Sequence, residues 1–176
     1  MQTRNLTLVA MLLLASCVAP PPPPAPRAAP APPPVAATPA PTPRLSADWN
    51  DWPFAVGDWV YRRDDRGSTA VFGPAGQNAV VSLRCNLQNR RIYVSREATA
   101  PGQRIVIRTS SSMKEFAAKP TGGTPVYLAS EIMPMDAILD AMAFSRGRIL
   151  LETDGHPPII LPAWAEIARI VEDCRY

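Results

Sequence analysis

The sequence predicts a mainly β domain of the α+β class, an antiparallel β-sandwich or barrel-like fold with one short internal helix and a C-terminal helix packed on it. Three observations predict this class. Short segments with alternating apolar residues recur at roughly ten-residue spacing, turn residues separate them, and only two stretches have helical periodicity. The part that folds is predicted to be residues 46–176. At about 130 residues it forms one domain that buries roughly two-thirds of its chain surface.

Eight segments carry the strand signals. They are Trp59–Arg62, Ser68–Phe72, Asn78–Cys85, Arg91–Ser95, Arg104–Arg108, Val126–Ala129, Ile149–Glu152 and Pro158–Leu161. The third alternates most clearly. Its apolar face consists of Ala79, Val81, Leu83 and Cys85, and its polar face of Ser82 and Arg84. The last two strands are separated by Thr153–Pro157, whose Asp-Gly pair is typical of a hairpin turn.

Two helices are predicted among the strands. Asp136 is the expected N-cap of a helix over Ala137–Ser145, and Gly147 ends it in the left-handed conformation that favours glycine. The last helix is predicted to begin at Pro162, because proline suits the first helical position. Its apolar stripe contains Trp164, Ile167, Ile170, Val171 and Cys174. This stripe indicates a helix that closes the core of the sheet, with a partner-binding amphipathic helix as the alternative.

Cys85 and Cys174 fall on the apolar faces of their predicted strand and helix. In an oxidising compartment, two inward-facing cysteines are expected to form a structural disulfide, here closing a loop of about 90 residues. A catalytic or redox pair is the alternative. It would show CxxC spacing or a nearby basic partner, and the sequence has neither.

The N-terminus has the pattern of an export signal. Arg4 precedes the apolar run Leu6–Ala15, which as a helix spans about 15 Å, roughly half a bilayer core. The following residues Leu14-Ala15-Ser16-Cys17 resemble the lipobox of bacterial lipoproteins. The resemblance implies that residues 1–16 are removed as a signal peptide and that Cys17 is acylated, becoming the first residue of the mature chain. A plain cleavable signal is the alternative.

Residues 17–45 are predicted to be the lipidated cysteine and a Pro/Ala-rich tether. Between Pro20 and Pro43 lie 13 of the 22 prolines of the chain, with no apolar periodicity. Such a composition favours a semi-rigid polyproline II spacer that reaches roughly 85 Å at full stretch. A PxxP ligand for an SH3-type module is the alternative.

The net charge also differs between the N-terminal 45 residues and the predicted domain. The formal net charge is +3, but three of the 18 basic residues lie in the first 45 positions, where there is no acidic residue. The predicted domain therefore has 15 basic and 15 acidic residues. Nucleic-acid binding needs a basic surface of one sign, so the sequence predicts no nucleic-acid partner.

No complete catalytic set is visible. Ser111-Ser112-Met113-Lys114 fits the SxxK pattern, but it follows a strand and lacks the partner motifs, so a loop is expected. His156 is the only histidine and is expected to be solvated in the hairpin turn. The Asp64-Asp65 pair is predicted to lie in a solvated turn. We therefore expect no catalytic residue, no metal site and no cofactor. Paired carboxylates for glycoside cleavage stay open, because their separation is spatial.

Arg146 and Arg148 flank Gly147 where the internal helix ends and a strand begins. If both side chains project from the same edge, their two guanidinium groups are expected to bind a carboxylate or phosphate of a partner through bidentate hydrogen bonds. In the alternative interpretation they cap the helix C-terminus and pair with Glu152 or Asp140.

The C-terminal half resembles lipoproteins of alphaproteobacteria that have no assigned activity. The likeness rests on Ala143–Arg148, Leu161–Trp164 and Ile170–Arg175 and covers most of residues 59–175. The general make-up is also similar to the invasion-associated locus B family, although the multiple paired cysteines and glycine-rich pattern of that family are missing. Neither resemblance implies a catalytic residue or a ligand.

Together these features predict a lipid-anchored protein of the outer membrane that faces the periplasm. Val18 stands after Cys17 where, in the lipoprotein family, an aspartate often signals inner-membrane retention. The expected role is non-catalytic binding or structural support, with an envelope protein or peptidoglycan as partner. The alternatives are a small envelope hydrolase and an inhibitor of a periplasmic enzyme such as lysozyme.

Overall fold

A computed structural model describes residues 48–176 as ten β-strands and two α-helices, preceded by a 3-10 turn at Trp49–Asp51. The strands are β1 (Asp58–Asp64), β2 (Gly67–Gly73), β3 (Val81–Asn86), β4 (Arg91–Glu97), β5 (Arg104–Arg108), β6 (Met113–Ala117), β7 (Lys119–Pro120), β8 (Tyr127–Ile132), β9 (Arg148–Thr153) and β10 (His156–Pro162). The helices are α1 (Ala137–Ala143) and α2 (Ala165–Arg175). The predicted signal peptide, Cys17 and the tether of residues 17–45 lie outside the described residues.

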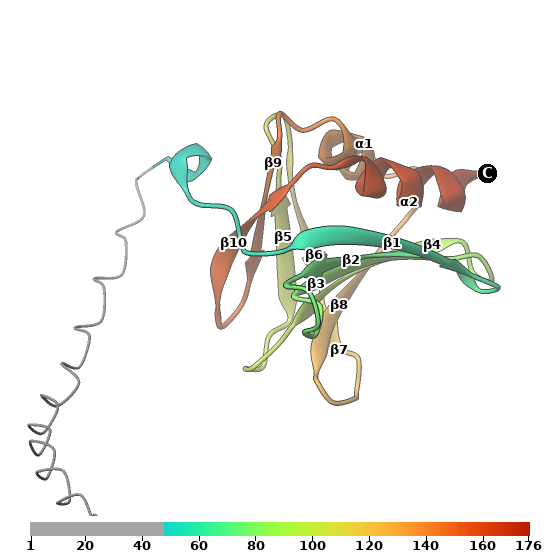
Figure 1. The fold of residues 1–176 in the computed structure, drawn as a ribbon, viewed down its shortest axis with the longest axis horizontal. Coiled ribbons are helices and arrows are strands. Elements are labelled where there is room, and N and C mark those ends of the chain that lie inside the picture. The colour runs from blue at the N-terminus through green and yellow to red at the C-terminus, as the bar shows by residue number, and fades with distance from the viewer. Residues whose placement is uncertain (1–47) are drawn as a thin grey trace, which may run out of the picture. The chain divides into compact units, whose positions relative to one another are not determined.

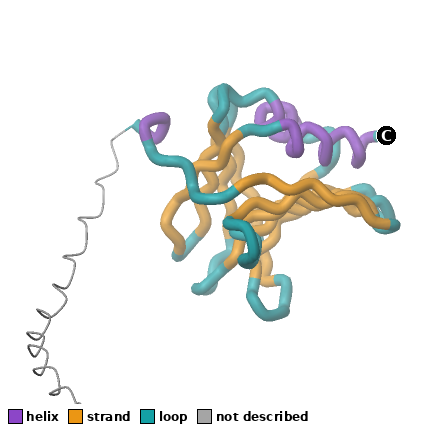
Figure 2. Tube along the Cα trace, in the orientation of Figure 1, coloured by secondary structure: helices purple, strands orange, loops and turns teal. Residues whose placement is uncertain are grey.

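The strands form two antiparallel sheets. The six-stranded sheet has the order β1-β2-β3-β4-β8-β7, and the four-stranded sheet has the order β10-β9-β5-β6. Both helices lie on the same side of the six-stranded sheet, as Figure 1 shows. The loops lie mainly at the strand ends (Figure 2). This arrangement confirms the predicted fold class of an antiparallel β-sandwich with one internal and one C-terminal helix.

The core fills the space between the two sheets and under the helices. In β3 the burial alternates as predicted, with Val81, Leu83 and Cys85 inside and Ser82 and Arg84 outside. The fully buried side chains of the other elements include Phe72, Ile92, Ile105, Ile107, Leu128, Ile138, Leu139, Met142, Leu151, Ile167 and Ile170. Every layer therefore contributes apolar area to one continuous core.

The helices differ from the prediction at their ends. The Asp136 side chain accepts the Ile138 backbone N–H, as expected of the N-cap, but α1 ends at Ala143 rather than Ser145. The last helix begins at Ala165, not at Pro162. Pro162 is instead the last residue of β10, where its carbonyl accepts the Trp59 indole N–H at 2.9 Å. The strand pairing and this buried hydrogen bond take precedence over the helix-start preference of proline.

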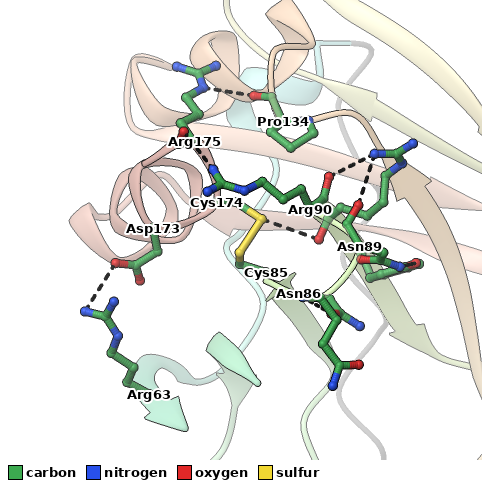
Figure 3. Close-up of a disulfide and its surroundings, with 12 residues drawn as sticks. Arg63, Cys85, Asn86, Asn89, Arg90, Pro134, Asp173, Cys174 and Arg175 are labelled. Atoms are coloured by element: carbon green, nitrogen blue, oxygen red, sulfur yellow. Dashed lines mark hydrogen bonds and ion pairs between the residues drawn. A yellow bond between two sulfur atoms is a disulfide. The ribbon is translucent and has the colours of Figure 1, made fainter. Parts of the chain in front are cut away.

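Helix α2 is held on the six-stranded sheet by a disulfide and by polar contacts. Cys85 of β3 and Cys174 of α2 are bonded, with their Cα atoms 5.4 Å apart, so the predicted pairing is confirmed (Figure 3). On strand β1 of the same sheet, the Tyr61 hydroxyl donates to the Asp173 carboxylate at 2.6 Å. Burial raises the pKa of Asp173, but the nearby Ser68 hydroxyl, the hydrogen bond from Tyr61 and the charges of Arg63 and Arg169 outweigh it and hold that pKa below its usual value.

Two strands were not predicted. Residues 113–117 form β6, although the sequence analysis expects a loop over Ser111–Lys114. The side-chain oxygen of Thr109 accepts the backbone N–H groups of Ser111 and Ser112, which forms the tight turn that returns the chain onto β5. Most of β6 is exposed, so its residues lack the apolar alternation that predicts a strand. The two-residue strand β7 pairs with β8 at the far edge of the six-stranded sheet.

None of the helices within residues 48–176 combines the length and the apolarity needed to span a lipid bilayer.

Candidate binding groove

The outer face of the six-stranded sheet carries a groove. Helix α2 packs on β1 to β4 from the opposite, core-facing side, and Figure 1 shows no helix on the outer face of this sheet. A hollow of about 460 Å³ lies there, lined by residues of β2, β3, β4 and β8 and of the loops beside them.

The floor of the groove is a row of small side chains that crosses the strands. Val71 pairs with Ser82, Ser82 with Ser95, and Ser95 with Ala129, so the four residues lie in register on neighbouring strands. All four are half-buried. The row spans three strand spacings, about 14 Å at roughly 4.8 Å per spacing. Because the side chains of this row are small, the surface is lower along the row than at the larger side chains on either side of it.

Larger side chains form the two walls. Arg84 and Tyr93 are register partners and stand on one side of the floor. Tyr127 stands on the other side, opposite Glu97 and therefore four residues along β4 from Tyr93. At about 3.3 Å per residue, the two tyrosine positions are separated by roughly 13 Å along the strand direction. The groove thus runs across the strands with an aromatic ring on each wall.

Hydrogen bonds of the hydroxyl groups fix both tyrosines. The Tyr127 hydroxyl donates to the Ala79 carbonyl at 2.7 Å, and burial, with the nearby charge of Glu97, raises the pKa of this phenol. The Tyr93 hydroxyl accepts from the Asn89 amide at 2.7 Å and lies 3.3 Å from a Glu131 carboxylate oxygen. Because the hydroxyl end of each ring is hydrogen-bonded, both rings are held in fixed positions on the walls of the groove.

The charges around the groove are paired. Arg84 donates to Thr69 at 3.2 Å and to Asp64 at 3.5 Å. The hydrogen bond from the Arg66 backbone N–H lowers the pKa of Asp64, and together with the charges of Arg84 and Arg66 it outweighs the opposing effect of desolvation. On the other side of Tyr93, Arg91 binds Glu131 at 2.8 Å. The lining therefore has no strong excess of either sign.

The groove continues toward the sheet edge. A second hollow of about 560 Å³ is lined by Lys119, Pro120 and Glu131, and it shares Tyr93, Thr121 and Ala129 with the first. The two hollows adjoin at these shared residues. An extended ligand has room to lie across β2, β3, β4 and β8 as far as β7.

A different, charged hollow of about 520 Å³ lies on the four-stranded sheet. Glu115 and Glu152 flank Val106 there, since both pair with it in register. His156 lines the same hollow, where it is half-buried rather than fully solvated. Its Nε2 accepts the Thr99 backbone N–H at 2.8 Å, and its Nδ1 lies 2.8 Å from the Asp154 carbonyl. Both ring nitrogens are thus engaged, which leaves the imidazole no free nitrogen to act as a base in this conformation.

Arg146 and Arg148, the predicted partner-binding pair, have different surroundings. Arg148 donates to the Trp52 carbonyl at 2.6 Å, and its guanidinium lies 4.2 Å from the centroid of the Phe54 ring. It fastens the entering chain beside β10, where Phe54 bridges to Ile160. The Arg146 side chain is exposed. A partner contact at Arg146 stays a prediction.

In the alternative interpretation, Arg146 or Arg148 pairs with Asp140, but the Asp140 carboxylate has a different partner. That carboxylate binds Arg175 of α2 at 2.8 Å, and this hydrogen bond lowers the pKa of Asp140.

The Ser111–Lys114 pattern is not assembled as a catalytic pair in the described structure. Lys114 forms an ion pair with Asp136, the N-cap of α1, at 2.5 Å.

Sequence reasoning identified neither Tyr93 nor Tyr127 as a site residue. The available signal was the polar face of the strands, where Ser82, Arg84, Tyr93 and Ser95 alternate with buried residues. Alternation alone shows that this face is outward, but only the register places its small residues in one row.

Within residues 48–176 there is no cluster of three or more His, Cys, Asp or Glu side chains arranged to hold a metal ion. Compared with known proteins, the chain matches no family model, no curated protein and no solved structure.

Proposed function

We propose that this chain is a lipid-anchored protein of the bacterial envelope that binds a periplasmic ligand through the groove on its six-stranded sheet, without catalysing a reaction. The observation that carries the binding proposal is the row of small side chains between two fixed tyrosine rings. A concave, pre-formed surface with a few fixed polar groups is typical of ligand sites. The anchor is inferred from the lipobox-like residues at Cys17.

A photo-crosslinking experiment tests the binding role. A photoreactive amino acid replaces Lys119, which is exposed on the rim of the groove, in the full-length chain expressed in bacterial cells. We expect irradiation to give a distinct adduct in the envelope fraction. The matched control places the same amino acid at Ser112, an exposed turn residue that lines neither hollow of the groove. No adduct at Lys119, or the same adducts at both positions, would contradict a groove that binds a ligand.

A second prediction concerns the anchor. Cys17→Ser removes the thiol that the lipoprotein pathway acylates, so we expect an uncut precursor or a soluble product in place of the membrane-bound form. Mass spectrometry of the mature N-terminus and membrane fractionation measure this result. Because Val18 follows the cysteine, the wild-type protein is expected in the outer membrane. An unmodified mature N-terminus at another residue would contradict the proposed anchor.

A further inference from the structure

We infer that the ligand of the groove is an uncharged oligosaccharide of N-acetylated hexosamines, an inference that rests on the proposed binding function. The groove offers aromatic faces, hydroxyl groups and small apolar side chains together, and two of its charged side chains, Arg84 and Glu131, are already in ion pairs. Each of these properties selects for a sugar chain over the other classes of periplasmic ligand.

The aromatic rings recognise the apolar side of a sugar. One face of a pyranose ring presents mainly C–H groups, and these pack on the electron-rich face of an aromatic ring. Tyr93 and Tyr127 are both half-buried and tethered through their hydroxyls, so their rings are the parts available for such packing. Between them, Val71 and Ala129 offer small apolar contacts for the methyl groups of N-acetyl substituents.

The floor recognises the hydroxyl and amide groups of a sugar. Ser82 and Ser95 stand in register in the middle of the row and are half-buried. Within the described residues, neither hydroxyl has a hydrogen-bonding partner. Each is therefore available to both donate and accept, as the alternating donors and acceptors of a sugar require.

The backbone of the floor excludes an extended peptide as the preferred ligand. Strands β2, β3 and β4 each have a paired strand on both sides, so the ladders already use their backbone N–H and C=O groups, whereas β7 pairs with only Leu128 and Ala129 of β8. A peptide strand gains affinity at free sheet edges, through main-chain hydrogen bonds that this face cannot offer. A peptide lying here would leave its own backbone groups without partners.

The charge pairing disfavours an anion. Arg84 is the basic residue that lines the first hollow, and it is already bound to Thr69 and Asp64. Lys119 lines the second hollow at the sheet edge and forms no ion pair within the described residues. Arg91 and Glu131 neutralise each other beside Tyr93. A phosphate or carboxylate ligand would have to displace an existing ion pair, whereas an uncharged polar ligand would not.

The test is a titration of the full-length lipidated chain, in a detergent without a sugar headgroup, with the β-1,4-linked tetramer of N-acetylglucosamine. We expect saturable heat on calorimetry. Tyr93→Ala should weaken binding by roughly tenfold, since one stacked ring is lost. Ser95→Leu should abolish binding by filling the middle of the floor. Tyr176→Ala, a tyrosine deletion at a fully exposed position, is the matched control and should leave binding unchanged.

The outcomes separate this inference from the proposed function. No binding of the tetramer by the wild-type chain overturns the sugar assignment. So does binding that survives both Tyr93→Ala and Ser95→Leu, once circular dichroism shows that the variants are folded. If the Lys119 crosslink then captures a protein, the groove still binds a ligand and only its chemical class is wrong. If the crosslink also fails, the proposed function falls with it.

Discussion

Replacing Cys85 and Cys174 together by alanine is expected to lower the free energy of unfolding by about 4.5 kcal/mol. The two residues are 89 positions apart, so the bond removes a large amount of conformational entropy from the unfolded chain. It also fastens α2 to β3, because the cysteines belong to these two elements. Both side chains are fully buried, and their truncation therefore adds a small loss of packing. Urea denaturation with linear extrapolation measures the change.

The control for this prediction is the effect of reductant. A thiol reductant should destabilise the wild-type protein by a similar amount and should leave the double variant unaffected. Single variants separate the two contributions, since each loses the bond but keeps one of the two buried thiols. Equal stability of the wild-type protein with and without reductant would contradict a stabilising role of the bond.

The strands that could be predicted are those whose two faces differ. In β3 buried apolar residues alternate with half-buried polar ones, and β4 follows the same pattern up to the buried Arg96, because one face packs on the core and the other faces outward. The internal helix was predictable for a similar local reason, since the Asp136 side chain caps it. The disulfide followed from two such patterns, because each cysteine fell on the apolar face of its element.

The features that the sequence did not predict depend on tertiary contacts. Strand β6 lacks alternation because most of its residues are exposed, and it exists through pairing with β5. Pro162 stays in β10 because Trp59, 103 positions earlier, binds its carbonyl. His156 is held by the backbone of Thr99, which no local pattern reveals.

The groove depends both on a local pattern that the sequence shows and on tertiary contacts that it does not. Its residues occupy outward positions that the alternation identifies, but the row from Val71 to Ala129 arises only when four strands align in one register. A shift of one residue would move each of these side chains to the other face of the sheet. The register is in turn fixed by the buried residues between them, of which Leu83 and Val94 are directly paired. The packing of the core therefore determines the shape of the groove on the opposite face.

Gly67→Ala is expected to lower the free energy of unfolding by about 3 kcal/mol, since it combines a strained backbone with a steric clash. Gly67 begins β2 with a φ of +136°, a conformation that residues with a side chain rarely adopt. A Cβ atom at this position would lie 2.2 Å from the carbonyl oxygen of Cys85. That contact is with the backbone of the neighbouring strand, so relieving it must shift the register pair of Gly67 and Asn86.

Gly76→Ala is the matched control for this prediction. Gly76 also has a positive φ, +75°, but no atom lies within 4 Å of the place its Cβ would occupy. Its substitution should therefore cost only the backbone term, about 1 kcal/mol. Urea denaturation of both variants measures the difference. Equal losses would mean that φ alone accounts for the effect and that the close approach of β2 to β3 at Cys85 adds nothing. A larger loss of stability at Gly67 would show that the close contact with the Cys85 carbonyl requires glycine at the start of β2. The strand alignment that forms the groove would then depend on this glycine.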